Sequence, residues 1–99
     1  MSNQIIEAPE LITEKNAEQL ANSWIKTLQC NQDLIIDLSK TKIINVVGYR
    51  VLLRAFLLAK IKKLDFCVCN PNENIKKILE DYGLGGIIAP YFEEKGRSH

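Results

Sequence analysis

Several features that direct a sequence toward a particular function are scarce or missing in these 99 residues. The three cysteines are odd in number and lack disulfide-rich spacing, which indicates a reducing compartment. The most apolar run, at 51–59, is too short to cross a membrane and contains Arg54. The N-terminus has no secretory signal. We therefore expect a cytoplasmic protein that does not insert into a membrane directly.

A strong bias of charge is also missing. The net charge is +1, and the one basic cluster, "KIKK" at 60–63, is short and typical of a solvated helix end. A nucleic-acid-binding surface normally needs a longer basic stripe, so no nucleic-acid partner is expected. Apolar residues make up 46% of the chain, which is enough to fill a core. We predict a single domain at 1–95 and treat "GRSH" at 96–99, with the only histidine, as a candidate remnant of an expression tag.

Strand and helix patterns alternate along the chain, which is typical of a layered α/β domain. Thr13 or Asn16 is placed to cap the first helix, Trp24 lies in the middle of its apolar stripe, and Gly83 is placed to end the third helix. We predict a small, mostly parallel or mixed sheet with about three to four helices. The expected extended segments are 4–13 (turning near Pro9), 33–39, 42–44 and 65–69, the expected helices are 17–28, 45–63 and 73–82, and a short apolar strand or helix is expected at 84–92.

The helix at 45–63 is apolar around most of its circumference. At about 100° per residue, one side groups residues that we assign to the sheet. The opposite side carries two arginines but also several large apolar residues, which indicates either a contact with a partner or burial under loops and neighbouring helices. We favour the partner surface. The sheet-facing set is Gly48, Tyr49, Leu52, Ala55, Phe56 and Ala59; the partner-facing set is Val47, Arg50, Arg54, Leu57, Leu58 and Ile61.

Candidate catalytic and metal-binding groups are few. Cys67 and Cys69 share one face of a predicted strand, but a zinc site needs four ligands and Cys30 is the only other thiol. "GLGG" at 83–86 is too short for a phosphate-binding fingerprint and follows a helix rather than a strand. No nucleophile is paired with a base. We expect no catalysis, no metal and no cofactor.

The order of elements and several local sequence stretches resemble the STAS domain family, which is named after sulfate transporters and anti-sigma-factor antagonists. The resemblance covers most of the chain, although no single motif decides it. It implies a protein-binding module. Three stretches carry it: "APELITEKNAEQLANSW" at 8–24, "LIIDLSKTKIINVVGYRVLL" at 34–53 and "CNPNENIKKILEDYGL" at 69–84.

In well-understood family members, a loop of the form Asp-Ser-Ser/Thr-Gly precedes the second helix, and a partner kinase phosphorylates its second hydroxyl. "NVVG" at 45–48 aligns with that loop and places Val47 at the phosphoacceptor position. Valine has no hydroxyl, so the resemblance implies a binding loop without the usual phosphorylation switch. The residues that we expect to contact a partner are Asn45, Val46, Val47, Gly48, Arg50, Arg54, Leu57, Leu58 and Ile61.

The family leaves several partners open. The first candidate is a kinase-type anti-sigma factor; the alternatives are the ATPase of a bacterial ABC lipid transporter, of which this chain would be a small subunit, and a signalling array. Self-association into a homodimer through the same helix is a further candidate. A different class of function, a small ligand- or nucleotide-binding domain, would predict a ligand-induced rise in melting temperature.

Overall fold

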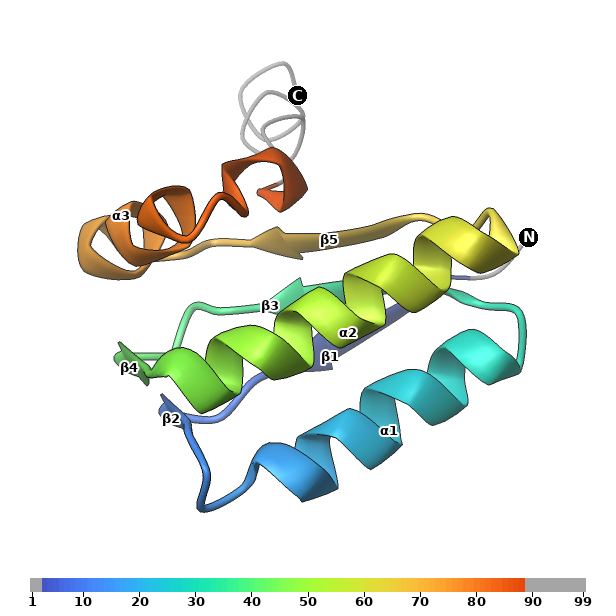
Figure 1. Cartoon of the computed structure of the whole chain (residues 1–99), viewed down its shortest axis with the longest axis horizontal. Coiled ribbons are helices and arrows are strands. Elements are labelled where there is room, and N and C mark those ends of the chain that lie inside the picture. Colours follow the sequence, from blue (N-terminus) through green and yellow to red (C-terminus); the bar gives the residue numbers. More distant parts are fainter. Residues whose placement is uncertain (1–2, 89–99) are drawn as a thin grey trace.

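The computed structural model describes residues 3–88 and shows the alternating strands and helices that the sequence predicts (Figure 1). Three α-helices and a short 3₁₀ turn are present among these residues, and the helix boundaries lie within one residue of the predicted ones. Residues 89–99, which include the predicted tag and the last four residues of the apolar segment predicted at 84–92, lie outside the described residues. The elements are β1 (Asn3–Glu7), β2 (Leu11–Ile12), α1 (Ala17–Gln29), β3 (Asp33–Asp37), β4 (Ile43–Ile44), α2 (Val46–Lys62), β5 (Phe66–Cys69), α3 (Glu73–Asp81) and η1 (Gly85–Ile87).

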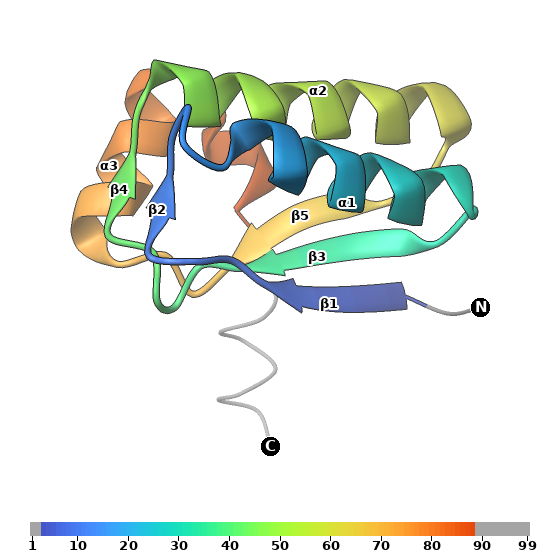
Figure 2. The same cartoon turned by 90° about the horizontal axis from the view of Figure 1, so that it is seen from below.

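The main sheet has three parallel strands in the order β1-β3-β5, and α1 and α2 lie on the same face of it (Figure 2). Successive side chains of a strand point to opposite faces of the sheet, so every second residue faces the helices. Leu34 and Ile36 of β3 are fully buried against the helices, together with Val68 of β5. Parallel strands need crossover connections, and α1 and α2 supply them.

A second, two-stranded parallel sheet is formed by β2 and β4, whereas the sequence predicted one sheet. The chain leaves the main sheet after β3 through a turn at Thr41, whose buried hydroxyl donates to the Pro9 carbonyl at 2.8 Å. The backbone N–H groups of Lys42 and Ile43 then donate to the Glu10 carbonyl. These bonds turn the segment at 42–44 away from β3 and place it beside β2, directly before α2.

The core lies between the main sheet and its helices, and Trp24 of α1 is fully buried in it, as predicted. Its indole Nε1 has no hydrogen-bond partner among the described residues. Asn16 precedes α1, but its side chain turns back to accept from Thr13 N–H and to donate to the Leu11 carbonyl, so neither predicted cap closes the helix. Gly83, by contrast, follows α3 with a φ of +81°, the left-handed conformation that glycine adopts most readily.

Candidate functional site

The segment at 45–48 forms the start of α2, and Asn45 organises it. The Asn45 Oδ1 accepts hydrogen bonds from the backbone N–H groups of Val47 at 3.1 Å and Gly48 at 3.0 Å. Two of the helix's unpaired amides are therefore satisfied by an N-cap side chain. The Asn45 Nδ2 donates to Glu14 Oε1 at 2.6 Å, and the Asn45 N–H donates to the Ile12 carbonyl at 3.3 Å. The loop is thus tied to the segment that follows β2.

The contact between Asn45 and Glu14 is also electrostatic. The hydrogen bond from the Asn45 amide lowers the pKa of the Glu14 carboxyl below its ordinary value of 4.5. Glu14 is exposed, so water screens this effect. The amide of Asn45 is oriented from both ends, because the carboxylate accepts from its nitrogen while the helix amides donate to its oxygen.

Gly48 is buried, and the reason is a close approach between α2 and β2. A Cβ at this position would lie 1.9 Å from the Ile12 carbonyl oxygen and 2.7 Å from its carbon. Real Cβ atoms do not come this close to backbone atoms, so only glycine fits. Gly48 therefore permits the close packing of the loop on β2. It presents no side chain to a partner, so only its backbone is available for the predicted contact.

The two valines of the loop are placed differently. Val46 is 46% exposed, whereas Val47 is half-buried and packs against the core. Neither side chain carries a nucleophile or a hydrogen-bonding group. What this loop offers to solvent is an apolar side chain above a capped helix terminus.

The outer face of α2 exposes most of the residues predicted for it. Leu57 is 48% exposed and Ile61 is 78% exposed, with Arg50 and Arg54 exposed beside them. Leu58 was expected on this face but is half-buried against the core, because its side chain lies at the flank of the helix. The helix contains no acidic residue between its first and last positions. Its solvent face is therefore apolar and cationic.

The predicted sheet-facing side of α2 needs a correction. Tyr49 and Phe56 are only half-buried, whereas Val51, which was not assigned to the core, is 6% exposed. The neighbouring helices explain this change. Val51 faces α1, and the Tyr49 ring stacks on Tyr82, just after α3, with ring centroids 4.4 Å apart. The buried arc is thus turned toward α1.

A groove of about 430 Å³ separates α1 from α2 and continues the exposed face of α2. Two alanines, a glutamate and an asparagine of α1 form one wall, and two valines and two arginines of α2 form the other. No ion pair of either arginine is found among residues 3–88. The lining residues are Ala17, Glu18, Ala21, Asn22, Val47, Arg50, Val51 and Arg54.

The thiols do not form a reactive centre. Burial, followed by the nearby Asp37 carboxylate, raises the pKa of the Cys69 thiol to about 11, so it stays protonated at neutral pH. Cys67 is half-buried, and Cys30 is exposed directly after the last residue of α1. Within the described part of the chain, no group of three or more metal-ligating side chains is found.

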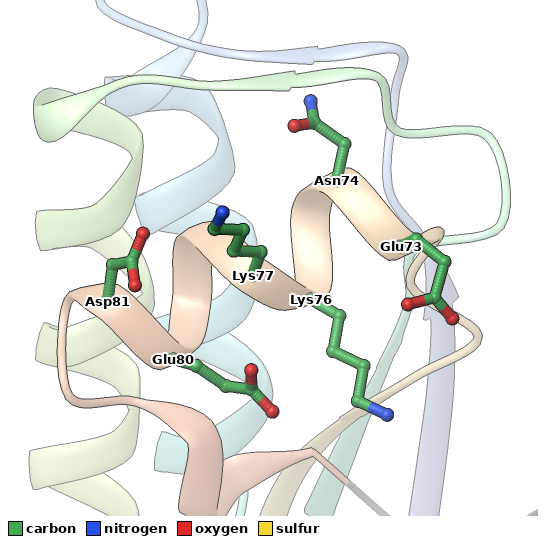
Figure 3. Close-up of a pocket in the computed structure, with 6 residues that line it drawn as sticks. All are labelled: Glu73, Asn74, Lys76, Lys77, Glu80 and Asp81. Carbon is green, nitrogen blue, oxygen red and sulfur yellow. The ribbon is translucent and has the colours of Figure 1, made fainter.

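A second hollow lies on α3, and Figure 3 shows that all six side chains around it come from that one helix. They project in different directions, and no other element of the described chain closes over them (Figure 3). Such an arrangement has no enclosed wall against which a ligand could be held. Its residues are Glu73, Asn74, Lys76, Lys77, Glu80 and Asp81.

Comparison with known proteins agrees with this architecture. A model of the STAS domain matches residues 2–96. The chain belongs to the STAS domain family. A search of curated protein sequences found no significant match. Among residues 3–88, no helix is long and apolar enough to span a membrane.

Several solved structures share the fold at low sequence identity. The anti-sigma factor antagonist SpoIIAA in its unphosphorylated form superposes with a TM-score of 0.76 at 17% identity, covering 98% of this chain and 88% of that one. The phosphorylated form of the Bacillus cell fate determinant SpoIIAA gives 0.70 at 15% identity, with 96% and 89% covered. A sulfate transporter family protein from Wolinella succinogenes gives 0.68 at 12% identity, with 82% and 66% covered. The predicted STAS-like α/β fold is confirmed.

Proposed function

We propose that this STAS domain is a non-catalytic, cytoplasmic protein-binding module that resembles anti-sigma factor antagonists. Its contact surface is the loop at 45–48 together with the outer face of α2. The observation that carries this proposal is the face itself. Exposed Leu57 and Ile61 lie beside two arginines without ion pairs among the described residues, on a helix without acidic residues. Packing of the core does not require an exposed apolar and cationic face, whereas binding of a protein partner does.

The loop is proposed to bind without a phosphorylation switch. In the alignment with the family's Asp-Ser-Ser/Thr-Gly loop, Val47 takes the phosphoacceptor position, and it has no hydroxyl to modify. The scaffold around it is nonetheless kept, because Asn45 caps the helix and Gly48 permits the approach of β2. Binding at this surface is therefore constitutive, or is controlled by another site.

The proposed partner is a kinase-type anti-sigma factor, and the likeness to SpoIIAA, a protein described as an anti-sigma factor antagonist, favours it. A role as the small subunit of an ABC lipid transporter or as a signalling-array scaffold is the second candidate. The fold alone does not separate these roles, since a sulfate transporter family protein shares it. Each of them would use an exposed face of the same domain.

The experiment is a pull-down from extract of the source organism, followed by mass spectrometry. Wild type is compared with Val46→Asp and Val47→Asp, which place a charge at the loop, and with Asn74→Asp, which places the same charge on exposed α3. We expect one protein to be retained by wild type and Asn74→Asp and lost from both loop variants. Equal capture by all four proteins would contradict the proposed surface.

A further inference from the structure

The first strand, β1, forms an open edge of the main sheet. It pairs with β3 on one side, and none of the described residues pairs with its other side. The N–H of Ala8, just after β1, donates to the Asp37 carbonyl at 2.9 Å. In a parallel ladder, alternate residues direct both backbone groups to the same neighbour. The backbone N–H and C=O groups of Asn3, Ile5 and Glu7 therefore point away from β3, along the open edge.

This edge lacks the usual protection against pairing with another strand. Its five residues contain no lysine and no proline, and the register with β3 is continuous without a bulge. Ile5 is 58% exposed. The only charged residue of β1 is Glu7, and Lys40 lies 3.3 Å from its carboxylate. Neither steric nor electrostatic features of β1 prevent the addition of a strand.

The flank of α1 that lies above this edge carries no charged residue. Figure 2 shows α1 above β1, with α2 on the other side of α1. Glu18 and Asn22 of α1 line the groove toward α2. At about 100° per residue, the opposite flank consists of Leu20, Ser23 and Thr27. None of these is charged, and Ser23, in the middle of the helix, is exposed.

We propose that the open edge of β1 and the flank of α1 above it bind a second copy of this chain, related by a two-fold axis near Ile5. An antiparallel pair centred on Ile5 sets Ile5 opposite its own copy and Asn3 opposite Glu7. All three of these residues direct their backbone groups outward, so the pair forms about six hydrogen bonds. No like charges stand opposite one another, because Glu7 faces Asn3 rather than the second Glu7.

The self-complementary register is what favours a second copy over a strand of unrelated sequence. The two main sheets would join into one continuous sheet, and the two α1 flanks would meet above it with uncharged side chains, of which Ser23 and Thr27 are small. The α2 face lies on the opposite side of α1 and stays uncovered (Figure 2). A dimer of this kind presents two partner-binding faces at once, and it differs from self-association through α2.

Sedimentation equilibrium of the full chain, over concentrations from about 1 to 500 µM, tests the proposal. Wild type is expected to show a mass approaching twice the 11.3 kDa of one chain. Ile5→Pro removes an N–H that no residue among 3–88 accepts, so the described fold keeps its own bonds while the edge is blocked. Ser23→Lys places like charges across the two-fold axis. Each variant is expected to raise the dimer dissociation constant at least about tenfold.

Asn74→Lys is the matched control, because it adds the same charge to an exposed position on α3, which lies away from α1 and β1 (Figure 1). It is expected to dimerise like wild type. A monomeric wild type over the whole range would overturn the proposal. So would a dimer that persists in both Ile5→Pro and Ser23→Lys, since self-association would then use another surface. The Ser23→Lys variant keeps the test valid even where Ile5→Pro fails to fold.

Discussion

Replacement of Gly48 by alanine tests whether the start of α2 is held against β2 as closely as the geometry indicates. The new Cβ would lie 1.9 Å from the Ile12 carbonyl oxygen, about 1 Å short of the closest approach that a Cβ makes. The helix must therefore move away from β2. That movement stretches the bond from Asn45 N–H to the Ile12 carbonyl, which already measures 3.3 Å.

The magnitude follows from three contributions. Overpacking costs about 1–3 kcal/mol, and the weakened hydrogen bond costs about 1 kcal/mol. Alanine returns about 0.5–1 kcal/mol of helix propensity. We expect Gly48→Ala to lower the free energy of unfolding by about 2 kcal/mol, which shifts the urea midpoint by about 1 M.

Fluorescence of Trp24, the only tryptophan and fully buried, reports the unfolding in urea. Gly86→Ala is the control, because a Cβ there meets no atom within 4 Å and the residue has no positive φ. Its stability is expected to stay within about 0.5 kcal/mol of wild type. A Gly48→Ala protein as stable as the Gly86→Ala protein would refute the reasoning about the close approach.

Three further predictions concern single side chains. Asn45→Ala removes the N-cap of α2 and is expected to cost about 1 kcal/mol in thermal unfolding, whereas Asn45→Asp, which keeps an acceptor oxygen, is expected to cost less. The pKa of Glu14 is lowered in the folded state, so its contribution to stability is present above pH 4.5 and is lost as the pH falls below that value. Glu14→Gln is expected to flatten the dependence of stability on pH below pH 4.5. An unchanged slope would argue against the bond to Asn45. The folded state keeps the Cys69 proton up to about pH 11, beyond the ordinary thiol value of 9.0, so Cys69 is expected to react with a thiol reagent far more slowly at pH 8 than exposed Cys30, as mass spectrometry of the labelled peptides would show.

Local sequence patterns were enough to predict the helices and the mostly parallel direction of the strands. The apolar spacing in α1 and α3 marks their buried sides, and Gly83 marks the end of α3. These features depend on neighbours within one or two turns, which a sequence pattern records directly.

Contacts between distant segments could not be predicted. The pairing of β2 with β4 depends on bonds from the Thr41 turn to Pro9 and Glu10, about thirty residues earlier in the chain. The close approach to Ile12 that requires Gly48 is equally non-local.

The orientation of α2 was also only partly predicted. An apolar helix gives little periodic signal, so α1 and Tyr82 decide which side is buried. As a result Leu58 and Val47 are half-buried, while the remaining large side chains of the predicted surface are exposed.

The most direct test of the account is the affinity of the captured partner for Leu57→Asp, measured by titration calorimetry beside wild type. Leu57 lies in the middle of the exposed face of α2 and is 48% exposed, so aspartate there leaves the core intact. The account predicts a dissociation constant at least about tenfold higher, because an apolar contact is replaced by a buried charge. An unchanged dissociation constant for a correctly folded Leu57→Asp protein would show that the partner binds elsewhere.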